Sequence, residues 1–120
     1  MATQNDSLKE QLANASEITI HVTGRKSGRA ISLPVWFVWE SDKLYLLPVQ
    51  GSDTQWYKNV VHKPSMRVEA AGGETELKVA AVTEPQQVSS VVEKFRSKYG
   101  PADVKKYYAK FDAAVESEPY

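Results

Sequence analysis

Three basic residues, Arg25, Lys26 and Arg29, surround a Ser-Gly pair in the stretch Gly-Arg-Lys-Ser-Gly-Arg at residues 24–29. Backbone N–H groups of a Gly/Ser-rich turn, together with cationic side chains, form a concave site for an anion. Arginine offers paired donors that match phosphate, and lysine offers a point charge. The pattern matches no known phosphate-binding loop, so from these residues alone a solvated hairpin turn is the more frequent outcome and anion binding is the alternative.

A second candidate site is the stretch 46–59, where an apolar run ends in Gln-Gly-Ser-Asp and a helical pattern begins. Such a junction offers unpaired N–H groups and the positive end of a helix dipole at one point. Gly51 would permit a flat ligand to approach the backbone closely. Trp56, Tyr57 and Asn59 would add ring surface and an amide. A capped helix whose Trp56 lies in the core explains the same residues without a ligand.

Aromatic side chains are concentrated at residues 36–39 and near the C-terminus. Trp36 and Phe37 are neighbours, so they lie on opposite faces of a strand and one of them must point outward. An outward tryptophan suits a ligand wall or a subunit interface. Tyr107 and Tyr108 are by type more often packing residues.

Composition excludes several classes of function. Lys plus Arg equal Asp plus Glu at 15 each, so the net charge gives no attraction to nucleic acid or to an anionic membrane. The chain has no cysteine, and its two histidines, His21 and His62, show no spacing typical of metal ligands. We therefore expect no metal. No Ser/His/Asp nucleophile arrangement is present either, so an enzyme of this sequence would need a bound cofactor to carry the chemistry.

These candidates must be positioned by elements that hydrophobic periodicity predicts. Alternating patterns predict strands at 17–23, 30–40, 44–49 and 111–117, and a hairpin at 65–83 around Gly72-Gly73. Helical spacing predicts a helix around Leu8, Leu12 and Ala15, one at 52–63 that Ser52 or Asp53 would cap, one at 88–99 that Thr83 and Gln86 would cap, and a short segment at 102–110.

Strands outnumber helices and are joined by short turns, which disfavours parallel βαβ units. A sheet of this length hides its edges best in a small closed or half-closed antiparallel barrel with helices at its ends. The 120 residues fit one domain, residues 1–120. We expect a cytoplasmic protein, because the N-terminal stretch is polar and no apolar run approaches membrane-spanning length.

Taken together, the motif TGRKSGRxxxxPVWFVWESDKLYLLPVxGSDxxWYKNV at residues 23–60 resembles the deazaflavin-dependent nitroreductase family. This family is a branch of the split β-barrel flavin-binding superfamily, which also includes the pyridoxamine phosphate oxidases. The resemblance covers residues 18–71 and, more loosely, the C-terminal tail. It implies a mainly β, α+β fold: a six-stranded antiparallel split barrel with flanking helices.

The resemblance also implies a function. Such proteins bind the deazaflavin coenzyme F420 in a groove on the side of the barrel, and they reduce quinones, nitroaromatics and other conjugated acceptors by hydride transfer. Tyr107 and Tyr108 are the counterparts of the family's substrate-side tyrosines and hence the candidate catalytic residues. The implied cofactor-binding residues are Arg25, Lys26, Ser27, Arg29, Pro34, Leu47, Pro48, Val49, Gln50, Gly51, Ser52, Trp56, Tyr57 and Asn59.

Two positions depart from the family pattern and leave alternatives open. Ile31 stands where the family often has arginine, and Gln50 stands where it commonly has lysine. Both changes remove positive charge from the phosphate side, so an FMN-dependent oxidoreductase of the same fold is one alternative. A non-enzymatic flavin or deazaflavin binder is another. Split barrels often pair through their faces, so an outward Trp36 or Trp39 would also suit a homodimer.

Overall fold

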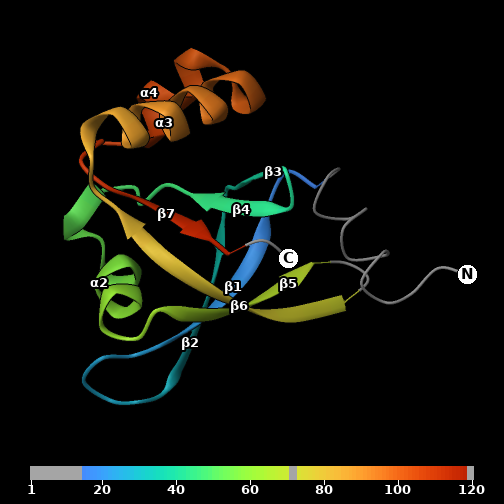
Figure 1. The fold of residues 1–120 in the computed structure, drawn as a ribbon, viewed down its shortest axis with the longest axis vertical. Coiled ribbons are helices and arrows are strands. Elements are labelled where there is room, and N and C mark those ends of the chain that lie inside the picture. The colour runs from blue at the N-terminus through green and yellow to red at the C-terminus, as the bar shows by residue number, and fades with distance from the viewer. Residues whose placement is uncertain (1–14, 71–72, 119–120) are drawn as a thin grey trace, which may run out of the picture.

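The computed structural model describes residues 15–70 and 73–118 (Figure 1). The helix expected around Leu8 and Leu12 lies outside the described residues. In chain order the elements are β1 (Ile18–Thr23), β2 (Ala30–Val35), β3 (Val38–Glu40), β4 (Lys43–Leu46), a 3₁₀ turn η1 (Gly51–Asp53), α2 (Gln55–His62), β5 (Ser65–Ala70), β6 (Gly73–Val82), α3 (Pro85–Tyr99), α4 (Pro101–Tyr107) and β7 (Ala114–Ser117).

The strands form one sheet of seven in the order β2-β1-β5-β6-β7-β4-β3, and every neighbouring pair is antiparallel. β2 and β3 stand at opposite ends of this order, yet only Trp36 and Phe37 separate them along the chain. Because so short a link spans about 10 Å, the sheet has to curl until its two edges come together. The result is a half-closed barrel with flanking helices, which confirms the mainly β, α+β prediction.

The predicted count of six strands is wrong, because the single strand expected at 30–40 is interrupted at Trp36 and Phe37. The N–H of Phe37 donates to the Tyr99 hydroxyl at 3.0 Å, and its carbonyl accepts from Lys98 Nζ at 2.8 Å. Two side chains of α3 therefore replace the sheet partners that would have continued the strand. β2 and β3 are two arms of one bent strand that closes the barrel.

The core has two parts, one inside the barrel and one between the sheet and the helices α3 and α4. Inside the barrel, Ile18, Ile20 and Val22 alternate inward from β1 and pack against Trp56 and Val60 of α2. At the other end, α3 and α4 pack side by side over the strands (Figure 1), with a second cluster around Phe95, Val104 and Tyr108.

Two predicted helix caps are wrong. Ser52 and Asp53 lie in η1, and α2 begins at Gln55 after Thr54, with no side-chain cap. Similarly, α3 begins at Pro85 after Glu84, and no side chain caps it. Proline has no N–H to be capped and its fixed φ favours the first helical position, so the helix starts there without the expected Thr83–Gln86 pair.

Two predicted strands are shorter than expected: the one at 44–49 ends at Leu46 as β4, and the one at 111–117 begins at Ala114 as β7. Two other predictions are confirmed. α3 ends before Gly100, whose φ of 98° a larger residue rarely adopts, and the hairpin predicted at 65–83 is the β5–β6 pair. Among the described residues, none of the helices combines the length and the apolar character that crossing a membrane requires.

Candidate functional site

The basic turn joins β1 to β2 and is held against α2 by Arg25. The Arg25 N–H and Nη1 both donate to Asn59 Oδ1, at 3.1 and 2.8 Å, and Nη2 donates to Gln55 Oε1 at 2.9 Å. Asn59 is buried, so its carbonyl oxygen needs these donors. Two residues predicted to contact a cofactor are thus bonded to each other, and they fix the turn at the start of α2.

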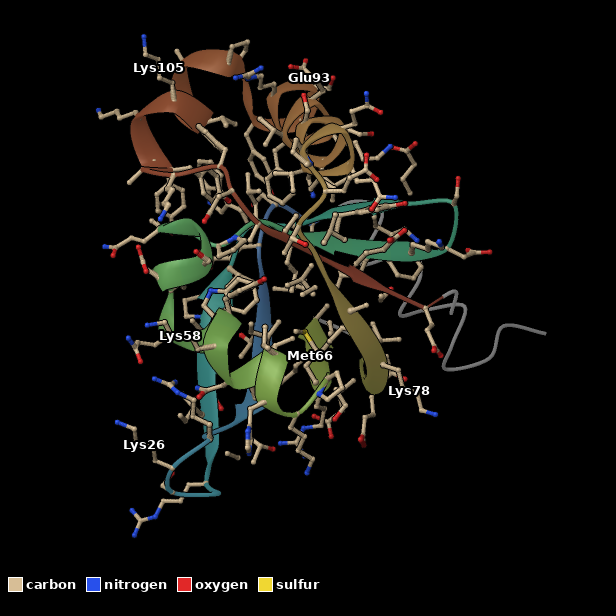
Figure 2. All side chains as sticks on the ribbon, turned by 60° about the vertical axis from the view of Figure 1, so that its left-hand side comes forward. Lys26, Lys58, Met66, Lys78, Glu93 and Lys105 are labelled. Atoms are coloured by element: carbon tan, nitrogen blue, oxygen red, sulfur yellow. The ribbon has the colours of Figure 1, made fainter. Side chains whose placement is uncertain are left out.

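The other basic residues of the turn project into solvent. Lys26 and Arg29 are exposed, and Figure 2 shows Lys26 at the tip of the turn. The Ser27 hydroxyl accepts from the Arg29 N–H at 3.2 Å. Across residues 15–70 and 73–118, no carboxylate forms an ion pair with Arg25, Lys26 or Arg29. Their positive charge is therefore available to an anion.

A shallow pocket of about 230 Å³ lies between the basic turn and α2. Its lining includes Ile31, the position at which the resemblance leads one to expect arginine. The start of α2 adds the positive end of a helix dipole to the same place. The lining residues are Gly24, Arg25, Lys26, Ser27, Ile31, Gln55 and Asn59.

A second pocket, also of about 230 Å³, is mainly apolar and lies at the other end of β2. It combines the end of β2, the segment that follows β4, the start of α2 and the end of α4. Leu33, Val35 and Thr54 were not among the predicted site residues, and Trp36 was predicted as a ligand wall or an interface residue but not as a cofactor contact. The lining residues are Leu33, Pro34, Val35, Trp36, Leu47, Val49, Thr54, Trp56, Tyr107 and Tyr108.

Trp36 is the centre of an aromatic cluster on one wall of this apolar pocket. Its ring stacks on Tyr99 with centroids 4.2 Å apart and planes within 10°, and it meets Tyr107 edge-on at 4.5 Å. Such contacts fix the ring in place and leave its remaining surface as a rigid wall. Of the two roles that the sequence left open for Trp36, the geometry places it in a pocket wall.

The two candidate catalytic tyrosines are in different environments. Tyr107 is 42% exposed and Tyr108 only 4%, although both line the apolar pocket. Burial raises the pKa of the Tyr108 hydroxyl far above its ordinary value, with smaller contributions from Tyr107 and Tyr99. Tyr108 therefore stays protonated and can act only as a neutral hydrogen-bond donor or acceptor.

The glycine loop does not present the free N–H groups that the sequence predicts. Gly51 N–H donates to the Pro48 carbonyl, and Gln50 N–H donates to Thr54 Oγ1. Ser52 donates its N–H and its hydroxyl to the two carboxylate oxygens of Asp112, at 2.9 and 2.6 Å. The loop is tied to the C-terminal segment instead of being open to a ligand, and no local pattern in the sequence signals the part played by Asp112.

Six predicted contacts line neither pocket: Arg29, Pro48, Gln50, Gly51, Ser52 and Tyr57. Pro48 and Tyr57 are buried in the protein interior. Burial, with Asp112 as the smaller cause, raises the pKa of the Tyr57 hydroxyl.

The two histidines are also separated. His62 is exposed in the last turn of α2. His21 lies on the outer face of β1, out of phase with the inward residues, where it contacts Ser32 and Glu69.

Solved structures of known proteins share this fold. An F420-H2 dependent reductase is 19% identical, with a TM-score of 0.68 over 86% of this chain and 94% of its own. HutZ, a heme storage protein from Vibrio cholerae, is 11% identical, with a TM-score of 0.71 over 99% and 92%. A domain-swapped dimer is 19% identical, with a TM-score of 0.69 over 92% and 90%. At these identities the likeness establishes the split-barrel fold alone.

Comparison by sequence gives the family. No curated protein matches this chain. A family model does, over residues 9–116, which include every described strand and helix except the last residue of β7. Its description is "Uncharacterized protein conserved in bacteria (DUF2255)". The chain therefore belongs to the DUF2255 family and has the split-barrel fold.

Proposed function

We propose that this protein is an oxidoreductase that binds the deazaflavin F420 and passes hydride to a planar acceptor such as a quinone, a nitroaromatic or an enone. One observation carries the proposal: an apolar aromatic pocket and a cationic pocket are lined by neighbouring residues of β2 and of the start of α2. Ile31 and Gln55 line the cationic pocket, and Leu33 and Trp56 line the apolar one. F420 has a flat ring at one end and a phosphate with an acidic tail at the other. A ligand of that shape matches both pockets at once.

The pocket sizes support one ligand that spans both. Each pocket holds about 230 Å³, whereas sites for small molecules usually hold about 300–1,000 Å³. Neither pocket alone is large enough for a whole dinucleotide-sized cofactor. Together they fall within the usual range.

At the apolar end, the protein's part is to hold a ring, exclude water and orient an acceptor. Trp36 and Trp56 provide fixed aromatic surface, and Leu47 and Val49 close the opposite wall. Bringing the ring and acceptor together accounts for most of the catalysis that such a site needs. F420 supplies the hydride, so no nucleophile is required from the chain.

Tyr107 is the residue best placed to assist the acceptor. Its exposure lets a substrate reach the hydroxyl, which can donate a hydrogen bond to the oxyanion that develops on a quinone or nitro group. Tyr108 is buried behind it, at 5.0 Å between ring centroids, and supports its position.

At the cationic end, the unpaired charges of the turn fit an anionic tail. Lys26 and Arg29 are exposed and can reach an anion directly, whereas Arg25 contributes mainly by holding the turn against α2. The glycine loop takes no part in the proposal, since Asp112 already fills its donors. With Ile31 and Gln50 in place of the family's basic residues, the site carries less charge, and this keeps FMN as the alternative cofactor.

We also propose that two copies pair over the groove. Ile31, Tyr107 and Phe111 are exposed apolar residues, and the first two line the pockets while Phe111 lies 6.3 Å from the Tyr108 ring. A second copy would cover these residues and deepen the site. The likeness to a domain-swapped dimer supports an assembly of this kind.

Parallel titrations with F420, FMN and hemin test the cofactor. We expect F420 binding in the micromolar range, and a loss of about 1 kcal/mol, or roughly fivefold, in Lys26→Ala. Lys105→Ala is the matched control, because Lys105 lies on α4 at the far end of the molecule from Lys26 (Figure 2). Absence of F420 binding would refute the proposal, and tighter binding of FMN would replace the cofactor.

Turnover is the second arm of the test. Reduced F420 is mixed with quinones and nitroaromatics, and its reoxidation is followed by absorbance. Tyr107→Phe should lower kcat by about tenfold without weakening F420 binding, because the lost hydrogen bond forms mainly as charge develops on the acceptor. Binding without turnover across the whole panel would instead identify a non-enzymatic binder.

A further inference from the structure

Three side chains with metal-ligating groups converge on the outer face of the barrel. His21 comes from β1, Glu69 from β5 and Glu74 from β6, three neighbouring strands of the sheet. One ligand atom from each lies within 4.8 Å of the other two. Glu69 and Glu74 belong to one hairpin, whereas His21 lies about 50 residues earlier in the chain, so residue spacing could not reveal the group of three, and the pairing of β1 with β5 brings His21 to the two glutamates.

The two carboxylates stand in a position that needs an explanation. Glu69 and Glu74 are directly opposite each other in the β5–β6 ladder. Like charges directly opposite on neighbouring strands destabilise a sheet. Arg67 offsets part of this repulsion, but its Nε is 3.8 Å from Glu74 and both side chains are about half exposed. A cation between the two carboxylates would offset it fully.

His21 is held as a ligating histidine usually is. Its side chain is only 14% exposed, its Nδ1 lies 2.6 Å from Ser32 Oγ, and its Nε2 lies 2.9 Å from Glu69 Oε1. Metal-binding histidines almost always form a hydrogen bond through the second ring nitrogen, which fixes the ring and its tautomer. Without a metal, Nε2–H donates to Glu69 while Nδ1 accepts from the Ser32 hydroxyl. Metal binding at Nε2 takes the other tautomer, in which Ser32 Oγ accepts from Nδ1–H and the Nε2 lone pair is directed at the ion.

We propose that His21, Glu69 and Glu74 bind a first-row divalent cation, with Zn²⁺ as the reference ion. Zn²⁺ bonds to nitrogen and oxygen are about 2.0–2.2 Å long, so tetrahedral ligand atoms lie about 3.5 Å apart. The His21–Glu69 pair has to open by about half an ångström, and no pair has to close by more than about 1.3 Å. Both glutamate side chains are 53% exposed and can make these shifts.

Three protein ligands leave a coordination position for water or an exogenous anion. The site joins β1 to the β5–β6 hairpin, so a bound ion fastens three strands together. It is also independent of the proposed cofactor groove, because His21 and Ser32 face outward while Leu33, next along β2, lines the apolar pocket. Failure of F420 binding would leave this inference untouched.

The two histidines of the chain provide the test and its control. Zn²⁺ is titrated by calorimetry into chelator-treated, full-length protein, in the wild type, His21→Ala and His62→Ala. We expect one saturable equivalent in the wild type, the same in His62→Ala, and an affinity at least tenfold weaker in His21→Ala. No saturable binding in the wild type, or equal binding in His21→Ala, would overturn the proposal.

A second set of variants separates ligands from supporting residues. Glu69→Gln and Glu74→Gln should each weaken Zn²⁺ binding, whereas Glu76→Gln, on the same strand as Glu74, should not. Ser32→Ala should cost about 10–100-fold in affinity by freeing the His21 ring, and Ser32→Thr should restore it. Melting curves without metal confirm that each variant folds. If Ser32→Ala and Glu76→Gln prove equally damaging, the loss comes from altered surface charge or packing and the site is refuted.

Discussion

Gly51 is the glycine at which an added Cβ atom would clash most severely with its surroundings. Its φ is 55°, and a Cβ at this residue would lie 2.0 Å from Asp112 Oδ1 and 3.1 Å from Lys110 Cγ. The close approach of the C-terminal segment, and not of a ligand, therefore requires glycine here. Gly28 also has a positive φ, of 72°, but a Cβ at that residue would have no neighbouring atom within 4 Å.

We predict that Gly51→Ala destabilises the protein more than Gly28→Ala does. The left-handed backbone costs about 1–2 kcal/mol at either position. Gly51→Ala should cost about 1–2 kcal/mol more, because it displaces Asp112 from both of its bonds to Ser52. Urea unfolding gives both values, and equal losses would contradict this view of the loop.

The Asp112 carboxylate also predicts a pH dependence. Its two hydrogen bonds from Ser52 are the main cause that holds its pKa below the ordinary 3.8, and Lys110 adds a smaller part. A lowered folded-state pKa gives stability that is fully present above the ordinary pKa and is lost as pH falls through the folded-state value. The gap in unfolding free energy between the wild type and Asp112→Asn should be constant above about pH 5 and shrink in acid. Urea unfolding at each pH measures this gap. A gap that grows below pH 4 would contradict the prediction.

At the scale of elements, the break between β2 and β3 depends on α3. We predict that Tyr99→Phe costs about 1–3 kcal/mol, because it leaves the buried Phe37 N–H without its acceptor. Tyr107→Phe is the control: its hydroxyl forms no hydrogen bond with another described residue, and it should change stability by less than about 0.5 kcal/mol. Hydrogen exchange at the Phe37 amide provides the direct readout, and it should quicken only in Tyr99→Phe.

The elements themselves were largely predictable from sequence. β1 alternates strictly between inward and outward residues, and α3 has apolar residues at helical spacing and ends at a glycine, so local pattern and tertiary burial agree. The basic turn and Trp56 could also be singled out from the sequence, because residue type alone gives the charge and the aromatic ring.

What could not be predicted depends on contacts between residues distant in the chain. The Tyr99 hydroxyl and the Asp112 carboxylate act on residues about 60 positions earlier in the sequence. Pro34 predicts an edge or a bulge in residues 30–40, and β2 does stand at one end of the strand order, but no local pattern places the break at Trp36 and Phe37. Likewise, nothing in the glycine loop indicates that its donors are already taken. Such long-range hydrogen bonds override the local conformational preference of the chain, and no pattern among neighbouring residues predicts them.

At the scale of the whole molecule, the proposed pairing predicts the oligomeric state. Light scattering should give twice the mass of one chain, and Phe111→Glu should shift the protein towards the monomer by placing charge in the covered face. Val61→Glu is the matched control, since Val61 is 55% exposed at the far end of α2 and outside both pockets. A wild type that is monomeric throughout the micromolar range would contradict the pairing.

The pairing of β6 has a consequence for the order in which the strands of the protein fold. The first part of β6 pairs with β5 and its last four residues pair with β7, so one strand joins the two halves of the sheet. As the chain leaves the ribosome, β1, β2, β5 and the start of β6 can pair at once, whereas the β3–β4 hairpin reaches the rest of the sheet only through β7. Pulse-labelled hydrogen exchange during refolding should protect β1 before β4. The pocket wall that follows β4 would then be the last part of the groove to form, so that a nascent chain cannot capture a ligand before its barrel is closed.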